Sequence, residues 1–148
     1  MKKRSEVIYK GLIMKNLIVK DFMLGKTLTF TADMPLQKAV DKLIGTHEHG
    51  GAVIDERGNM IGWLSGKDCL AKMVEASYYC ELVALVEDVM ITEVTSVSTT
   101  TSIVDLAQMI IKSTHQLYPV INEDGQFVGM IGRKNVLRAL SQQASKCS

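Results

Sequence analysis

The sequence predicts an α/β (α+β) fold in which two β-α-β-β-α repeats pack sheet to sheet about a pseudo-twofold axis. A shift of 67 residues aligns the chain with itself, and 11 of the 52 positions in residues 19–70 are then identical to their counterparts. Each copy alternates short β-branched stretches with segments of helical periodicity. Two copies favour a pseudo-symmetric pair over a solenoid, which needs three or more repeats.

The first copy begins with a short Thr-rich strand at residues 28–31. A helix follows, because apolar residues recur at helical spacing over residues 36–44 and Pro35 suits a first turn. Polar residues around Gly58 separate two β-branched runs, which is a hairpin signal. The hairpin strands and the closing helix are expected at residues 52–54, 60–64 and 67–76.

The second copy repeats this order, with Ser102 in the place of Pro35 and Gly125 in the place of Gly58. Its strands and helices are expected at residues 95–98, 103–111, 119–121, 127–131 and 134–144. We therefore divide the chain into an N-terminal extension (1–16), a first repeat (17–77), a connector (78–85), a second repeat (86–141) and a C-terminal tail (142–148). The connector is apolar and is expected to contribute to dimerisation.

The composition is that of an ordinary globular protein, with 47% hydrophobic and 22% charged residues in 148. A net charge of +1 gives no basic footprint for nucleic acid. No run reaches the roughly 18 consecutive apolar residues of a membrane-spanning helix. We expect neither nucleic acid nor membrane as a partner.

The N-terminal segment MKKRSEVIYKGLI lacks the apolar stretch and cleavage site of a signal peptide. Met14 precedes the first organised segment, so residues 1–13 are an extension or a start-site artefact. Cys69, Cys80 and Cys147 are odd in number and lack metal-ligand spacing. Reduced thiols and a cytoplasmic location are therefore expected.

The duplicated motifs resemble those of a tandem pair of cystathionine-β-synthase (CBS) domains, also called a Bateman module. The resemblance covers residues 17–141. It rests on V-x-D-x-M at 19–23 and 86–90, on YPVINEDGQFVGMIG at 118–132 and on its counterpart GAVIDERGNMIGWLS at 51–65. The resemblance implies regulatory binding of an adenosine compound such as AMP, ADP, ATP or S-adenosylmethionine, with no obligatory cofactor. It also implies a homodimer of paired modules that signals to a protein effector.

The family's nucleotide-binding signature, Gly-h-h-Thr/Ser-x-x-Asp with h apolar, matches Gly62–Asp68. The Asp68 carboxylate offers two acceptor oxygens to the two ribose hydroxyls. The Ser65 hydroxyl and the N–H groups of the helix start can receive a phosphate, and Lys67 adds a positive charge. Trp63 is expected to line the base. By family geometry, the second copy completes the site through Thr101, Gln116 and Leu117.

The second copy departs from the signature, because Gly132 replaces the hydroxyl residue and Asn135 replaces the aspartate. Asn135 keeps one acceptor oxygen but loses charge-assisted bonding to both ribose hydroxyls. We expect a second site that is weak, empty or phosphate-selective. Its residues are Asn135, Arg133, Lys134, Met130 and His49.

Each of these features also has a purely structural interpretation. Ser65 and Asp68 fit the capping box that begins a helix. Cys69 is either a reactive thiol beside a helix start or, more simply, a small packed residue. The His47-Glu48-His49 stretch lacks third and fourth ligands, so no metal site is expected.

Two functions fit the sequence. The first is a ligand-sensing module that binds an adenosine nucleotide in the cleft between the repeats and signals by a conformational change. The alternative is a dimerising interaction module with no physiological small ligand, which the degraded second motif favours. An enzyme is not expected, because the sequence has no nucleophile elbow, phosphate-binding glycine loop, triad or zinc set.

Overall fold

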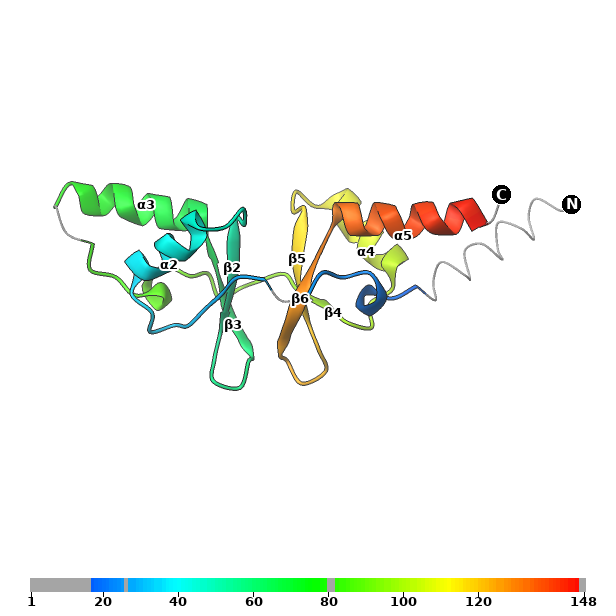
Figure 1. The fold of residues 1–148 in the computed structure, drawn as a ribbon, viewed down its shortest axis with the longest axis horizontal. Helices are drawn as coiled ribbons and strands as arrows, with labels where there is room; N and C mark the ends of the chain where they lie inside the picture. Colours follow the sequence, from blue (N-terminus) through cyan, green and yellow to red (C-terminus); the bar gives the residue numbers. More distant parts are fainter. Residues whose placement is uncertain (1–16, 26, 80–81, 147–148) are drawn as a thin grey trace, which may run out of the picture. The chain divides into compact units, whose positions relative to one another are not determined.

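The computed structural model of the chain describes residues 17–25, 27–79 and 82–146 (Figure 1). The order β-α-β-β-α occurs twice, as predicted, and each copy begins with a short 3-10 helix. The first copy contains η1 (Val19–Asp21), β1 (Thr29–Phe30), α2 (Leu36–Ile44), β2 (Gly50–Ile54), β3 (Met60–Ser65) and α3 (Gly66–Ser77). The second contains η2 (Val86–Asp88), β4 (Val97–Ser98), α4 (Ile103–Lys112), β5 (Leu117–Ile121), β6 (Phe127–Gly132) and α5 (Arg133–Lys146).

The predicted elements differ from the observed ones mainly at their ends. Pro35, expected in the first turn of a helix, lies one residue earlier, at the N-cap of α2. The Leu36 N–H donates to the Ala84 carbonyl at 2.9 Å, and the Pro35 carbonyl accepts from the helix. The predicted extension at residues 1–13, Cys80 and Cys147 lie outside the described residues.

The described residues form two compact units, and these units exchange segments of the sequence repeats. Unit 2 comprises residues 26–95 with 124–127, and unit 1 comprises the rest. The V-x-D-x-M segment of each repeat, here called its lead-in segment, therefore lies in the unit built around the other repeat. In unit 1 the Val19 N–H donates to Thr101 O at 2.9 Å, and in unit 2 the Glu87 N–H donates to Ala32 O at 3.0 Å.

Unit 2 contains a three-stranded sheet in the order β1-β2-β3, with β1 parallel and β3 antiparallel to β2. Helices α2 and α3 cover one face of this sheet (Figure 1). Apolar side chains from the sheet, both helices and the lead-in segment form the core: Phe30, Leu36, Ala39, Val40, Val53, Leu64, Cys69 and Val86.

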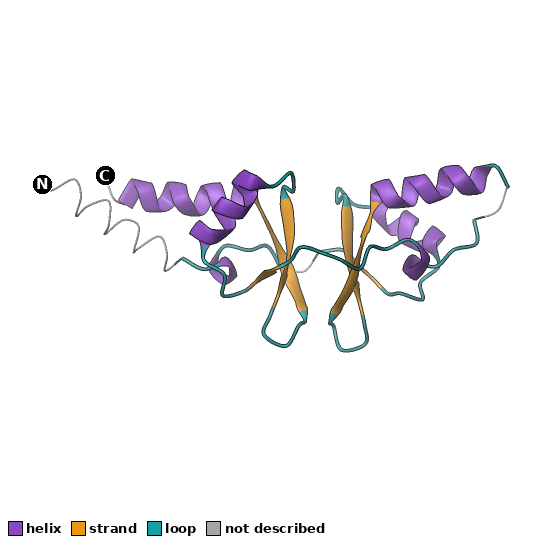
Figure 2. Ribbon diagram, turned by 180° about the vertical axis from the view of Figure 1, so that it is seen from behind, coloured by secondary structure: helices purple, strands orange, loops and turns teal. Residues whose placement is uncertain are grey.

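Unit 1 repeats the arrangement, with the sheet order β4-β5-β6 and α4 and α5 on one face (Figure 2). Its core contains Val19, Val97, Ile103, Leu106, Ile110, Tyr118, Val120, Ile131, Val136 and Ala139. Val19 and Val86 are both completely buried, so each lead-in segment supplies a core residue to its unit. No helix among the described residues is long and apolar enough to cross a membrane.

The two cores fill one equivalent space in different ways. In unit 2 a Cβ added to Gly51 would lie 2.9 Å from Phe30 Cε2, so the Phe30 ring lies against this glycine. In unit 1 the counterparts are Val97 and Tyr118, which are both buried. The large residue therefore comes from the first strand in unit 2 and from the central strand in unit 1.

The hairpin turns confirm the prediction that a glycine lies between the two strands of each copy. Gly58 has a φ of 84° and Gly125 a φ of 81°. Side chains strongly disfavour this left-handed region, whereas glycine adopts it readily. In the first turn the Asp55 carboxylate also accepts from the Arg57 N–H and the Asn59 N–H, at 2.9 Å each.

Candidate functional site

The first motif lies where β3 meets α3. Ser65 is the N-cap of α3, and its Oγ accepts from the Asp68 backbone N–H at 3.0 Å. The same hydroxyl donates to Asp68 Oδ2 at 2.9 Å. Asp68 Oδ1 makes no hydrogen bond with any residue in the described part of the chain. The motif thus combines a capped helix start with a half-buried carboxylate that keeps free acceptor capacity.

Four residues of β2 and β3 lie together on one face of the sheet beside the start of α3. Gly50 pairs with Ser65, and Ala52 pairs with Trp63, across β2 and β3. Cross-strand partners share a face of the sheet, as do residues two apart on one strand, so these four positions lie on one face. A Cβ added to Gly50 would lie 2.9 Å from Trp63 Nε1. The indole therefore crosses in front of Gly50, on the same face as Ser65.

The residues around the motif are anchored through the backbone. The Gly66 N–H donates to His49 O at 2.8 Å, which ties the start of α3 to the start of β2. Trp63 and Ile91 exchange two backbone bonds, of 2.9 and 3.0 Å, so the residue that directly follows the lead-in segment of unit 2 pairs with β3. Lys67 is exposed in the first turn of α3.

Cys69 is a packed residue of the core, 3% exposed. Burial, and next the negative charge of Asp68, raise the pKa of its thiol above the ordinary value of 9.0. A thiolate is the reactive form of cysteine, so this position is the reverse of a redox-active one. Within the described ranges, no three His, Cys, Asp or Glu side chains gather as metal ligands, and His47 and His49 are both exposed.

The second motif keeps the backbone connection but changes the side chains. The Arg133 N–H donates to Gln116 O at 3.1 Å, which is the counterpart of the bond from Gly66 to His49. Asn135 is 7% exposed, and its Oδ1 accepts from the Gly132 N–H at 2.9 Å. The amide oxygen expected to face a ligand is therefore turned inward to the backbone of β6.

An apolar side chain lies beside this inward-turned amide. A Cβ added to Gly132 would lie 3.0 Å from Leu117 Cδ1, so the Leu117 methyl occupies the region where Ser65 carries its side chain in unit 2. Met130, the counterpart of Trp63, is 1% exposed and exchanges backbone bonds with Leu24. Arg133 and Lys134 are exposed at the start of α5.

The predicted site residues divide between the units. Unit 2 contains Trp63, Ser65, Lys67, Asp68 and also His49, which the sequence analysis assigned to the second site. Unit 1 contains Met130, Arg133, Lys134 and Asn135, together with Thr101, Gln116 and Leu117, which it assigned to the first site. The Thr101 hydroxyl accepts from the Ser98 N–H at 3.2 Å, and its carbonyl accepts from Val19.

Gly50 is not among the residues predicted from the sequence, although the space left by its missing side chain accommodates the Trp63 indole. The signal is available in the repeat, because the Gly50-Gly51 pair aligns with Leu117-Tyr118 in the second copy. A glycine pair at the start of an otherwise β-branched strand marks a close approach of another group.

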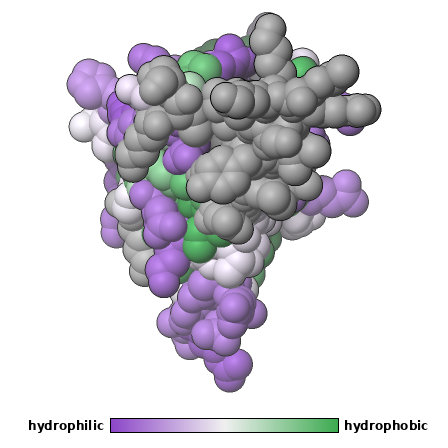
Figure 3. Space-filling model, turned by 90° about the vertical axis from the view of Figure 1, so that its right-hand side faces the viewer, coloured by the Kyte–Doolittle hydropathy of each residue, from purple (hydrophilic) through white to green (hydrophobic). Residues whose placement is uncertain are grey.

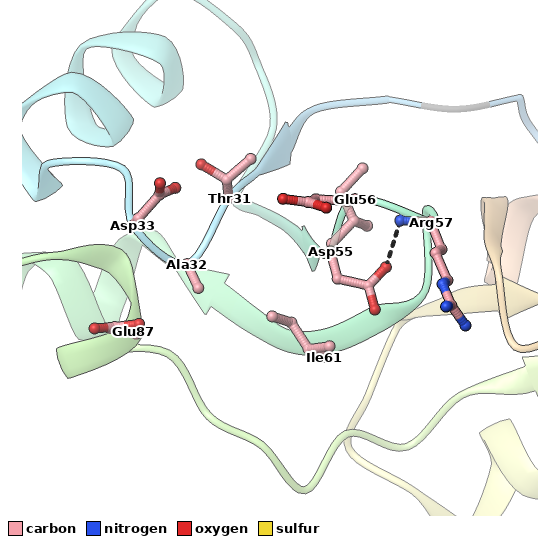
Figure 4. A pocket seen from close by; sticks show the side chains of 9 residues that line it. Thr31, Ala32, Asp33, Asp55, Glu56, Arg57, Ile61 and Glu87 are labelled. Carbon is pink, nitrogen blue, oxygen red and sulfur yellow. Dashed lines mark hydrogen bonds between the residues drawn. The ribbon is translucent and has the colours of Figure 1, made fainter.

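A cavity of about 600 Å³ that no motif predicted is lined by residues at the end of β2 opposite the Ser65 motif. Figure 4 shows the side chains that line it. Carboxylates dominate its lining, with Arg57 as the cation: Asp33, Asp55, Glu56 and Glu87. Unit 1 has a counterpart of about 300 Å³ in which Lys20 replaces Glu87 and Asn122 replaces Asp55. Of these two equivalent cavities, the one in unit 2 is therefore the acidic one.

The CBS domain family model matches residues 19–75 and 86–142, so the chain belongs to the CBS domain family and contains a tandem pair of its domains. The chain is 27% identical over 139 residues to "Uncharacterized protein YtoI" of Bacillus subtilis (strain 168). That match covers 92% of this chain but 30% of the relative's length.

Solved structures confirm the fold. A CBS domain-containing protein of unknown function from Bacillus anthracis matches with a TM-score of 0.78 and 23% identity, covering 89% of this chain and 98% of that one. CBSX2 in complex with AMP matches with a TM-score of 0.71 and 25% identity, covering 85% and 97% of the two chains. The predicted two-copy α+β architecture is that of these CBS-pair proteins.

Proposed function

We propose that the chain is a regulatory module that binds an adenosine nucleotide at the Ser65–Asp68 motif of unit 2. One observation carries the proposal. Asp68 stands in the first turn of α3 with one carboxylate oxygen, Oδ1, without a hydrogen bond among the described residues. Capping of the helix does not require Asp68 Oδ1, because the Ser65 hydroxyl already accepts from the Asp68 N–H.

The chemistry of a nucleotide fits this arrangement. Two adjacent ribose hydroxyls need two acceptors, which a carboxylate supplies. A phosphate is favoured at a helix N-terminus, where backbone N–H groups and the helix dipole attract an anion. The exposed Lys67 ammonium adds a third attraction. Because a carboxylate repels a phosphate, Asp68 is assigned to the sugar and the start of α3 with Lys67 to the phosphate. The Ser65 hydroxyl would have to release Asp68 Oδ2 before it could donate to a phosphate oxygen.

The comparison with CBSX2 supports AMP as the first ligand to test, because that protein is in complex with AMP and is 25% identical to this chain. ADP, ATP and S-adenosylmethionine share the adenosine moiety and are the alternatives. The second motif is proposed to be the weaker one, because Asn135 replaces the carboxylate and its Oδ1 already accepts from the Gly132 N–H.

The helix faces support a homodimer. Ile44 and Ile111 are equivalent in the repeat and are 76% and 81% exposed. Leu70 and Leu137, also equivalent, are 62% and 59% exposed. On the side viewed in Figure 3, apolar atoms reach the surface among hydrophilic ones. Ile111 and Leu137 line one groove of unit 1, and exposed apolar side chains gathered in this way are typical of protein interfaces. Occupancy would reach a protein effector by a change in dimer packing, which requires a ligand that prefers one packing.

The same apolar residues favour the alternative function, a dimerising interaction module without a physiological small ligand. Analytical ultracentrifugation of Leu70→Asp and Leu137→Asp tests the interface itself. Dissociation of the dimer by these changes, together with no response to any adenosine compound, would favour the alternative.

Thermal unfolding tests the nucleotide site directly. At 100 times its dissociation constant, AMP should add about 2.7 kcal/mol to the free energy of unfolding of the wild-type protein. Asp68→Asn should abolish the shift, because the amide offers only one acceptor to the ribose. If no adenosine compound raises the melting temperature, the proposal is wrong.

Asp105→Asn is the matched control. Asp105 stands in the first turn of α4, and its N–H is capped by Ser102 at 3.0 Å as that of Asp68 is by Ser65. This variant should keep the full AMP-induced shift. An Asp68→Asn protein that still shifts as much as the wild type would show that the nucleotide binds elsewhere.

A further inference from the structure

We infer that Gly50 makes the unit 2 motif the chain's single nucleotide site, by letting the Trp63 indole lie across β2 as a stacking surface for the base. The inference rests on the proposed function and extends it. Gly50 is proposed to determine which of the two motifs binds the nucleotide, and Trp63 is proposed to contact the base.

The first step is the placement of the indole. A Cβ added to Gly50 would lie 2.9 Å from Trp63 Nε1 and 2.7 Å from Leu64 O. Any side chain at this position would therefore displace the indole or the strand. Trp63 is half-buried, and its indole Nε1–H has no hydrogen-bond partner among the described residues.

The second step is the position of the indole relative to the motif. Gly50 and Ser65 are paired across the strands, and Trp63 lies two residues before Ser65 on the same face. An aromatic surface thus borders the helix start and the carboxylate assigned to phosphate and ribose. Aromatic side chains stack on any base, because every base has a π-face. The ligand class is a nucleotide with a planar base rather than a sugar phosphate.

The third step is the contrast with unit 1. Leu117 replaces Gly50 there and lies 3.0 Å from the position of a Cβ on Gly132. Met130 replaces Trp63 and is 1% exposed, while Asn135 is 7% exposed and bonded to the backbone. Leu117, which is 40% exposed, thus stands where unit 2 has a glycine with an indole across it. The second motif therefore lacks both the free carboxylate oxygen and the aromatic surface of the first.

Trp63 is the chain's single tryptophan, so its fluorescence reports on the proposed stacking. AMP should quench the emission of the wild-type protein, whereas ribose 5-phosphate should not. Trp63→Met, which installs the unit 1 residue, should weaken AMP binding about 10-fold and leave ribose 5-phosphate binding within about 3-fold. Trp63→Phe, which keeps an aromatic ring, should stay within about 3-fold of the wild type for AMP.

Gly50→Leu should weaken AMP binding at least as much as Trp63→Met, and Gly45→Ala, at the end of α2, is the control glycine substitution. Calorimetry should give one AMP per chain for the wild type and for Gly45→Ala at the same affinity. Should Gly50→Leu fail to fold, the two Trp63 variants and the stoichiometry still test the inference.

Two results would overturn the inference and leave the proposed function standing. One is Trp63→Met binding AMP as tightly as the wild type while Asp68→Asn does not bind. The other is a stoichiometry of two AMP per chain. Failure of the wild type to bind any adenosine compound would instead overturn the proposed function, and the inference with it.

Discussion

The Ser65 hydroxyl donates to Asp68 Oδ2 at 2.9 Å while it accepts from the Asp68 N–H at 3.0 Å, so the two residues bond to each other twice. At the equivalent place in unit 1, only the Asn135 side chain contributes, through its bond from the Gly132 N–H. The two helix starts are thus capped from opposite directions, and this difference can be measured.

Ser65→Ala should lower the free energy of unfolding by about 1 kcal/mol, the usual cost of removing a helix N-cap. It should cost at least as much as Ser102→Ala, because Asp68 also loses the hydroxyl that donates to it, whereas Ser102 only accepts from the Asp105 N–H. Urea unfolding measures the free-energy change of both variants, provided that the denaturant m-value stays the same as in the wild type. A Ser65→Ala protein as stable as the wild type would contradict the capping role.

Asn135→Ala should lower the free energy of unfolding by about 1–3 kcal/mol, because it leaves the buried Gly132 N–H without its acceptor. The comparable change Asp68→Ala should cost less, since the Asp68 N–H keeps its bond to Ser65. Chemical unfolding of the two variants gives the order. If Asn135→Ala and Asp68→Ala lowered the free energy of unfolding equally, the buried bond of Asn135 would not be the stronger contribution to stability.

Gly58→Ala and Gly125→Ala should each cost about 1–2 kcal/mol, because φ is 84° and 81° at these turns. Gly45→Ala is the control. Gly45 has a φ of −76°, and an added Cβ would meet backbone oxygens at an ordinary 3.6 Å. This control should be neutral or stabilising by about 0.4–1 kcal/mol. Thermal unfolding of the three variants tests the hairpin turns.

The Cys69 thiol should reduce stability at alkaline pH. Its folded-state pKa is raised, mainly by burial, so the folded protein holds this proton more tightly than the unfolded chain. The corresponding stability is complete below pH 9.0 and is lost as pH rises through the folded-state pKa. Cys69→Val, which installs the residue type of the counterpart Val136, should show a smaller loss of stability as pH rises above 9.0. Identical pH profiles for the wild type and the variant would refute this assignment.

Much of the fold follows from local patterns in the sequence. The 67-residue repeat gives the element order twice, and Gly58 and Gly125 fix the hairpins because only one backbone region serves such turns. Helical periodicity gives α2 and α4 within one or two residues of their observed ends. The turns and helices depend mainly on residues close together in the chain, so they can be predicted from local sequence patterns.

The remaining features depend on packing between distant segments. Nothing local to Val19 or Val86 indicates that each belongs to the core built around the other repeat. The inward turn of Asn135 depends on Leu117 and the backbone of Gly132, 18 and 3 residues away. The Ser65 motif could be identified from its spacing, whereas Gly50 acquires its role only through the indole that crosses it.

The exchange of lead-in segments affects the order in which the chain can fold. During synthesis, residues 17–25 leave the ribosome well before the rest of their unit, which ends with the last helix. A fragment ending before residue 86 lacks the completely buried Val86 of its own unit. The core of either unit is therefore incomplete until the lead-in segment and the repeat that it joins have both been synthesised.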